Sequence, residues 1–433
     1  MQHVEIKNLG PIKKCSLDIG KFTVLTGPQS NGKSTIAKAI FFFRTLEEEF
    51  YAQIRSQNPD DEFHTSLRND LEKRMRNKFL RTFGSSWSMP RNMKIEYLYS
   101  KGVAIAVYLE EDWSDSRKNF VKFEFSSKLH EFLEKYKNYE KLQWDENSLK
   151  NLRNEIHALI GDSYETLYIP AGRSMITLLS DQLAAFLADE DFRKLDFCTQ
   201  FYMRKILQLR GQIGEGLVAL LQEKLSTSQI KIDKSSLRLL LDLMDKVLKG
   251  RYAYTSGEER IVMLQKDHKY VKINFASSGQ QEAVWLFNIF YYYILMRRPV
   301  FVLLEEPESH LYPDSQKYMA EAMGLFANAG NAVFVTTHSP YILGEFNNLI
   351  LAGQIKQNQA VKDLEKVLSP LKYLEKDWTQ AVYVHKGATE NALNEDDLIR
   401  NELIDDASDA INQEADALMQ MEWTLKEEAG TDA

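Results

Sequence analysis

Short apolar runs along the chain predict strands of two kinds. Residues 299–307 (PVFVLLEEP) and 331–340 (NAVFVTTHSP) contain uninterrupted apolar runs, which are typical of parallel strands covered on both faces of a sheet. Residues 93–112 instead alternate apolar and polar positions around a Ser-Lys-Gly turn, and residues 119–127 (NFVKFEFSS) follow. This second pattern predicts a small antiparallel meander, so we expect a mixed sheet.

The remaining strands are expected among helical stretches. They are predicted at 3–9 and 22–26, on either side of an LGPIKK turn, at 165–173, and as a hairpin at 259–275. Helical periodicity covers 45–92, 128–160 and 176–249. Strands and helices that follow one another in this way predict an α/β fold.

Composition fits a globular protein with a substantial core. The 433 residues are 44% hydrophobic and 27% charged, enough for one large domain with insertions or two to three smaller units. The longest apolar run, at 283–296, has 14 residues, whereas a membrane span needs ~20, so we expect a buried helix and no membrane partner.

The two cysteines and the N-terminus bear on the compartment. Cys15 and Cys198 form no Cys-x-x-Cys pair, which argues against a zinc hook or a disulfide framework. A predicted strand follows Met1 almost directly, so we expect no signal peptide and a cytoplasmic location.

Negative charge is concentrated at the C-terminus. Residues 390–433 contain 14 acidic and 2 basic side chains, while the whole chain has a net charge of −8. The rest of the chain is therefore weakly positive, and the overall charge says little about a nucleic-acid partner. Apolar residues in this tail recur at helical spacing: Leu403, Ala407, Ile411, Ala415 and Leu418. The predicted acidic helix could dock a partner or pack on its own domain; both interpretations remain open.

The sequence GPQSNGKST, at residues 27–35, has the spacing of a phosphate-binding loop. It follows the predicted strand at 22–26 and opens a helix, an arrangement that points backbone N–H groups at phosphate oxygens. Lys33 is expected to reach the β- and γ-phosphates of ATP, and Ser34 to bind Mg²⁺. The candidate nucleotide-binding residues of this loop are Gly27, Asn31, Gly32, Lys33, Ser34 and Thr35.

Two further strands end in residues suited to phosphoryl transfer. Glu305 and Glu306 close the apolar run at 299–307; the first is expected to hold Mg²⁺, and the second to take a proton from the attacking water. His338, at the end of the next apolar strand, is the candidate γ-phosphate sensor. A Ser-Gly turn at 275–286 (FASSGQQEAVWL) opens a helix and predicts a further anion site.

Together, these motifs in this order resemble the heads of ABC-type ATPases. The resemblance is closer to the SMC-like and RecF-like branch, and within it to AAA-family ATPases of bacterial defence such as the OLD family. SSGQQE is similar to the ABC signature, with Ser278, Gly279 and Gln281 as the nucleotide-contacting positions, and EEPESHLYP is similar to Walker B and the D-loop. The resemblance covers 1–44 and 250–345, and it implies a head-to-tail homodimer, or a higher even-numbered assembly, with ATP sandwiched between subunits.

Three features depart from that pattern or extend it. Gln280 stands where transporters have a second glycine, and a Q-loop glutamine is not identified. The segment IPAGRS is similar to one in the defence ATPases, so Arg173 is expected either near the nucleotide or in a structural salt bridge. OLD proteins carry a Toprim nuclease after the head, but only 95 residues follow His338 here, and they lack its pattern.

The chain therefore resembles the ATPase subunit of two-gene antiphage systems such as PARIS or Septu. This resemblance implies a separately encoded effector, a nuclease or toxin, and a response to phage infection. The alternative is a RecF-like ATPase that clamps DNA in repair or recombination. Residues 73–94 contain seven basic residues with Phe79, Phe83 and Trp87. One interpretation is a binding surface for nucleic acid, or for a trigger protein that mimics the charge of DNA. The other is a solvated helix face whose aromatic residues belong to the core.

The expected domain organisation is discontinuous. The head comprises 1–44, 93–127, 164–175 and 250–355; helical insertions occupy 45–92 and 128–163; a helical lid or arm occupies 176–249; and a C-terminal segment, 356–433, ends in the acidic amphipathic helix.

Overall fold

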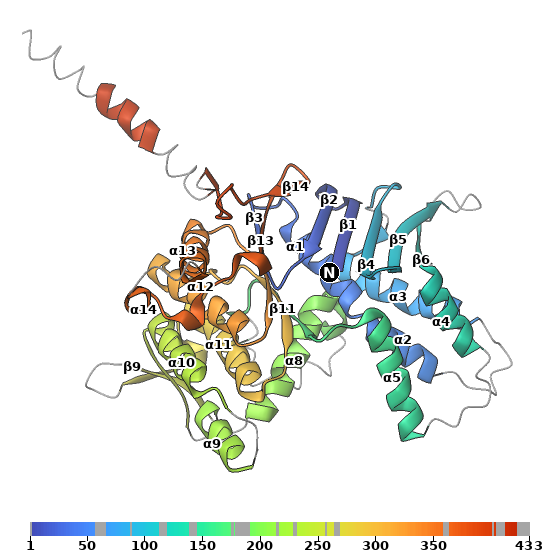
Figure 1. The fold of residues 1–433 in the computed structure, drawn as a ribbon, viewed down its shortest axis with the longest axis horizontal. Helices are drawn as coiled ribbons and strands as arrows, with labels where there is room; N and C mark the ends of the chain where they lie inside the picture. Colours follow the sequence, from blue (N-terminus) through green and yellow to red (C-terminus); the bar gives the residue numbers. More distant parts are fainter. Residues whose placement is uncertain are drawn as a thin grey trace, which may run out of the picture.

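A large mixed sheet runs through the computed structural model, with helices packed on its faces (Figure 1). The structure describes residues 2–56, 66–86, 89–111, 119–137, 145–174, 177, 191–213, 216–227, 232–255, 258–263, 269–357, 363–400, 402–403 and 412–421. Within them, the 11-stranded sheet has the order β6-β5-β4-β1-β2-β14-β13-β3-β12-β11-β7. The predicted α/β fold with a mixed sheet is confirmed.

One half of the sheet is parallel. Its strands are β13 (Thr379–His385), β3 (Phe22–Thr26), β12 (Ala332–Thr336), β11 (Val300–Glu305) and β7 (Glu165–Ile169). Successive side chains of β11 enter two different cores, because Val302 belongs to one buried cluster and Phe301 and Leu303 belong to the other. Burial on both faces explains the uninterrupted apolar runs.

The other half is antiparallel and contains the predicted meander. Its strands are β2 (Ile12–Ile19), β1 (Gln2–Leu9), β4 (Lys94–Ser100), β5 (Val103–Glu111) and β6 (Asn119–Phe125). Strand β2 was not predicted, because part of it was assigned to the turn at 9–14. It alternates buried and exposed residues over most of its length, which is the pattern of a strand with one solvated face.

Helices cover both faces of the sheet. On the side of Phe301 are α1 (Lys33–Arg44), α2 (Leu46–Arg55), α3 (Leu67–Phe83), α4 (Ser127–Lys137) and α5 (Glu146–Ile160). Packed mainly on the other side are α8 (Phe197–Ile213), α9 (Leu217–Thr227), α10 (Lys234–Leu248), α11 (Ser278–Met296), α12 (Pro313–Asn328) and α13 (Pro340–Gln357). Helix α11 is buried nearly all round, as expected for the run at 283–296. No helix in the described ranges is long and apolar enough to cross a membrane.

A smaller antiparallel sheet lies beside α10. It consists of β8 (Gly250–Thr255), β9 (Glu258–Met263) and β10 (Tyr270–Lys272). Strands β9 and β10 form the hairpin predicted at 259–275.

The basic segment at 73–94 divides between core and surface, because Lys78 is buried whereas Lys73, Arg74, Arg81 and Arg91 are exposed. Phe79 is fully buried, and Phe83 packs against the same core. Lys78 is also buried and donates a hydrogen bond to the Thr45 carbonyl. Trp87 lies outside the described residues. Phe79 and Phe83 therefore fit the interpretation of a helix face over core aromatics, and not that of a stacking surface for nucleic acid.

The C-terminal segment contributes to the main sheet, which the sequence division at residue 355 did not anticipate. Strand β13 pairs in parallel with β3, and β14 (Ala388–Asn391) returns antiparallel to it through a turn in which Lys386 and Gly387 have positive φ. Ile399 is still buried and exchanges two hydrogen bonds with the side chain of Asn347 on α13. Strand β14 has only four residues, too few for a periodic signal.

Residues 412–421 form a helix that stands away from the sheet and its flanking helices (Figure 1). Leu418, Met419 and Met421 are 61–65% exposed. The helix is therefore not packed on its own domain over these residues. Ala407 and Ile411, which belong to the same predicted pattern, lie outside the described residues.

The position of β13 predicts where the chain can be shortened. A chain ending at residue 403 should keep its melting temperature within about 3 °C of the full chain, because the strands and the Ile399 contact remain. A chain ending at residue 378 should fail to fold, since it loses the strand that covers one edge of β3. Circular dichroism melting and gel filtration of both chains would measure this. Cooperative melting of the shorter chain at the full-length temperature would contradict the assignment of β13 to the core.

Candidate active site

The loop between β3 and α1 is shaped by two glycines. Gly27 and Gly32 have φ of 137° and 100°, values that side-chain-bearing residues rarely adopt. A Cβ at Gly27 would overlap the carbonyl oxygen of Val384 on β13, and one at Gly32 would overlap the side chain of Ile12 on β2. The loop is thus wedged between two hairpins, and its N–H groups precede a helix N-terminus, as a phosphate-binding loop requires.

Lys33 folds back onto this loop. Its Nζ donates hydrogen bonds to the carbonyl oxygens of Gly27 at 2.6 Å and Pro28 at 3.0 Å. Burial lowers the pKa of Lys33, against the opposing effect of the charges on Glu306 and Glu308. The Lys33 ammonium is therefore close enough to the acidic turn after β11 for the charges on Glu306 and Glu308 to stabilise its protonated form.

The other loop residues divide into exposed and bracing positions. Ser34 is exposed and Thr35 half-buried in the first turn of α1. Asn31 braces the loop: its Nδ2 donates to the carbonyls of Pro28 and Gln29, and its Oδ1 accepts from the N–H of Lys386 in the β13–β14 turn. Asn31 thus ties the loop to the C-terminal hairpin.

Glu305 and Glu306 occupy the end of β11 and the turn after it. Glu305 is buried, and its Oε1 has no hydrogen-bond partner within the described residues. Glu306 is half-buried with φ of 43°, and its N–H donates to the Thr336 carbonyl on β12 at 2.9 Å. A buried carboxylate oxygen without a partner, at the carboxyl end of a strand, is the kind of oxygen ligand that Mg²⁺ prefers.

His338 follows β12 and is held by Glu308, a residue that the sequence analysis did not identify. The buried Glu308 Oε1 accepts from the backbone N–H of His338 and the hydroxyl of Thr337, and it lies 3.0 Å from His338 Nδ1. This hydrogen bond raises the pKa of His338. Burial would raise the pKa of Glu308, but the hydrogen bonds from His338 and Thr337 outweigh it and lower that pKa. The third carboxylate of EEPES, two residues after Glu306, was the available signal.

Arg173 forms the salt bridge that was one of its two expected roles. Its guanidinium is buried and pairs with Glu282 on α11 at 3.1 Å. It also donates to the carbonyl oxygens of Glu305 and Glu306. Arg173 therefore holds the acidic turn by the backbone carbonyls of the turn and leaves its carboxylates unbonded to the guanidinium.

The signature-like segment begins α11. Ser277 caps the helix, in a capping box with Gln280, and Ser278 is exposed at its first position. A Cβ at Gly279 would overlap the carbonyl oxygen of His310, so the helix approaches the loop after β11 closely. Gln281 differs from expectation: its side chain is buried and donates to the carbonyls of Ile273 and Asn274. The Gln281 side chain thus holds the turn that precedes α11, and it is not exposed on the surface as Ser278 is.

The predicted residues thus gather in two places. The loop at 27–35, the acidic turn and His338 follow the carboxyl ends of the neighbouring parallel strands β3, β11 and β12, the edge at which α/β sheets bind ligands. Ser278 is presented separately, at the start of α11. No group of three or more His, Cys, Asp or Glu side chains that could hold a metal is found in the described ranges. A Mg²⁺ held by Ser34 and Glu305 would therefore need oxygens from nucleotide and water.

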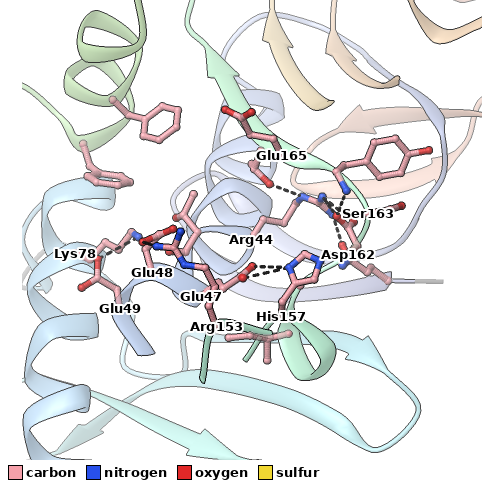
Figure 2. A pocket seen from close by; sticks show the side chains of 18 residues that line it. Arg44, Glu47, Glu48, Glu49, Lys78, Arg153, His157, Asp162, Ser163 and Glu165 are labelled. Carbon is pink, nitrogen blue, oxygen red and sulfur yellow. Dashed lines mark hydrogen bonds and ion pairs between the residues drawn. The ribbon is translucent and has the colours of Figure 1, made fainter. Parts of the chain in front are cut away.

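A charged cleft of about 550 Å³ lies at the opposite end of α1 (Figure 2). Its polar side chains pair with one another: Arg44 with Asp162 at 2.7 Å, Lys78 with Glu49 at 3.3 Å, and His157 with Glu47 at 3.2 Å. Burial lowers the pKa of Lys78 to about 8. None of the predicted site residues lines this cleft, which joins the helical insertions to β7.

Comparisons with known proteins show the family of the chain. Three solved structures are similar to the chain in outline: the SMC head domain from Thermotoga maritima (13% identity, 89% of this chain and 96% of that chain, TM-score 0.36), an SmcHead bound to the C-winged helix domain of ScpA (13%, 90% and 95%, 0.37), and an Smc head with an extended coiled coil bound to the C-terminal domain of ScpA from Pyrococcus furiosus (14%, 90% and 96%, 0.38). A comparison with curated proteins finds no match. The family model described as AAA ATPase domain matches residues 1–343. Because that match spans most of the chain, the protein belongs to the AAA ATPase domain family.

Proposed function

We propose that the protein is a Mg-ATP-dependent, dimerising ATPase that controls a separately encoded effector, a nuclease or toxin, in defence against phage. The observation that carries the ATPase part is the convergence of the glycine-lined loop, the acidic turn and His338 at one edge of the sheet. The effector part rests on the exposed acidic helix at 412–421. The defence role rests on the resemblance of the motif set to antiphage ATPases.

Each residue at this edge has a role in the proposed hydrolysis. The loop N–H groups and Lys33 hold the phosphates, and Ser34 and Glu305 hold Mg²⁺. Bound Mg-ATP supplies the phosphoanhydride bond and the metal charge that neutralises it. Glu306 takes a proton from the attacking water, and His338, oriented by Glu308, faces the γ-phosphate position. The raised pKa of His338 favours its charged form, which suits contact with an anion.

Support for a dimer comes from exposed aromatic residues beside the nucleotide motifs. Phe275, just before the signature-like turn, is 79% exposed; Tyr312, after the acidic turn, is 75% exposed; and Tyr341, after His338, is 53% exposed. Aromatic residues are enriched in the buried cores of interfaces. A second copy of the chain that presents Ser278 to the nucleotide would cover these side chains and complete the charge clamp.

The second candidate function is a RecF- or SMC-like ATPase that binds DNA directly in repair or recombination. The same nucleotide site serves both functions. They differ in what the ATP-bound protein holds, because a DNA clamp needs exposed cations whose binding depends strongly on salt. The packing of Phe79 and Lys78 removes part of the surface that favoured DNA at 73–94.

Replacing Glu306 with glutamine tests the proposed general base. Glu306→Gln should bind ATP like the wild type and hydrolyse it on the order of 10²–10⁴-fold more slowly. The matched control is Lys33→Ala, which should lose ATP binding itself. Calorimetric titration with Mg-ATP and steady-state phosphate release measure the two effects. Wild-type turnover in Glu306→Gln would remove this residue from the role.

Dimerisation can be tested in the same slow variant. Glu306→Gln with ATP should sediment as a dimer, because hydrolysis no longer separates the subunits. Adding Ser278→Arg should restore the monomer while leaving ATP affinity unchanged, since the new side chain fills the space for the second nucleotide. Analytical ultracentrifugation with and without ATP reads this out. An ATP-dependent dimer in the double variant would exclude the signature role of Ser278.

The proposed effector is tested by identifying what co-purifies with the slowly hydrolysing Glu306→Gln variant from its native host. Glu306→Gln should retain, in stoichiometric amount, a protein encoded beside its own gene, and the same variant ending at residue 403 should not. The control Lys33→Ala should show whether capture depends on ATP. Bound DNA without such a protein would favour the repair function, and capture of neither would contradict an effector bound to the ATP state.

A further inference from the structure

The guanidinium of Arg173 donates hydrogen bonds to the backbone of the acidic turn and to a side chain of the signature-like helix. Its Nη1 donates to the carbonyl oxygens of Pro170 at 2.9 Å and Glu305 at 2.6 Å. Its Nη2 donates to the carbonyl oxygen of Glu306 at 3.0 Å and to Glu282 Oε2 at 3.1 Å. One rigid, planar group thus fixes two consecutive peptides of the turn, a geometry that the single ammonium of a lysine does not reproduce.

The turn needs such support because its backbone is strained. Glu306 has φ of 43°, in the left-handed region that a non-glycine residue rarely adopts and that persists only where its surroundings hold it. The Glu306 N–H is bonded to the Thr336 carbonyl, and Arg173 holds the carbonyl on the other side of the same residue. Together these bonds fix the backbone of Glu306, and with it the direction in which its side chain leaves the turn.

The same guanidinium is tied to the signature-like helix. Glu282 lies in the second turn of α11 and is almost fully buried. Its other oxygen, Oε1, lies 3.7 Å from Nε2 of His310 in the loop after β11. The carbonyl oxygen of the same His310 is the atom that a Cβ at Gly279 would overlap. Thr177 adds a second connection, because its hydroxyl donates to the carbonyl of Gln281 at 2.9 Å. The start of α11 and the acidic turn are therefore linked through buried groups.

We propose that Arg173 is a positioning residue that, through its ion pair with Glu282, makes the orientation of Glu305 and Glu306 depend on the position of the signature-like helix. The inference rests on the proposed function. In the proposed dimer, Ser278 at the start of α11 contacts the nucleotide of the partner subunit, whereas Glu306 acts on the nucleotide of its own subunit. The Arg173–Glu282 pair then connects the two nucleotide sites across one chain.

The test compares turnover with ATP binding in variants of this pair. Arg173→Lys keeps the charge but loses the fork, so its kcat should fall on the order of 10- to 100-fold while its Kd for ATP stays within about twofold of wild type. Glu282→Gln should lower kcat in the same direction, because the guanidinium loses its anchor on α11. Phosphate release with Mg-ATP and calorimetric binding of ATP measure both quantities.

Glu321→Gln provides the matched control. Glu321 is a buried carboxylate on α12 that pairs with Lys372 at 2.8 Å, and neither residue belongs to the proposed site. Both glutamine variants should lose similar stability in urea, since each removes the negative partner of a buried cation, but only Glu282→Gln should lower kcat. If Arg173→Lys fails to fold, the comparison of Glu282→Gln with Glu321→Gln still tests the proposal.

Two results would overturn the inference. Turnover of Arg173→Lys and Glu282→Gln within twofold of wild type would show that the pair does not position the turn. An equal loss of kcat in Glu282→Gln and Glu321→Gln would show a general loosening of the fold. Either result leaves the proposed function intact, because that function is tested separately by ATP hydrolysis of the wild-type protein, by ATP-dependent dimerisation and by effector capture.

Discussion

The confinement of the loop at 27–35 between two hairpins is the constraint on which the site depends. On one side the loop meets the β1–β2 turn, where Ile12 leaves no room for a side chain at Gly32; on the other it meets β13, where Val384 leaves none at Gly27. The two hairpins are joined to each other, since the N–H groups of Lys13 and Lys14 donate to the carbonyl of Gly387. The loop is therefore shaped before any ligand binds, which reduces the entropy lost on binding.

This arrangement also explains why the first and last parts of the sheet must fold together. Strand β14 bridges the antiparallel and parallel halves, because it pairs with β13 and meets β2 at Lys14. The polar connection between Asn31 and Lys386 spans 355 positions of sequence. Contacts of such separation form late, after the entropy of closing long loops has been overcome. A complete phosphate-binding loop thus requires that nearly all of the head be in place.

The sequence predicted the parts of the site that are local and missed those that depend on tertiary contacts. The glycine loop, the acidic strand end and His338 each carry a short motif at the end of an apolar strand, and the structure places them at one edge. Glu308 was missed because its place two residues after Glu306 marks a third carboxylate near the strand end but does not show that this carboxylate is buried against His338. Gln281 shows the converse, since motif spacing does not determine that its side chain turns inward to the carbonyls of Ile273 and Asn274. Strand β13 was missed because its burial comes from pairing with β3.

The distribution of buried charge separates the two polar regions of the molecule. In the cleft at the far end of α1, the buried cations Arg44 and Lys78 are each matched by a carboxylate, so no charge there needs a ligand. At the edge that holds the acidic turn, Glu305 keeps an unpartnered oxygen within the described residues, and Lys33 is satisfied only by carbonyls of its own loop. A buried carboxylate oxygen without a partner costs free energy. A binding cation would offset that cost, and a phosphate would draw Lys33 away from carbonyls that the loop can leave to solvent. The unpartnered oxygen of Glu305 and the lysine bonded only to its own loop thus make this end of the sheet, and not the cleft, the place where the proposed metal–phosphate pair would gain most from binding.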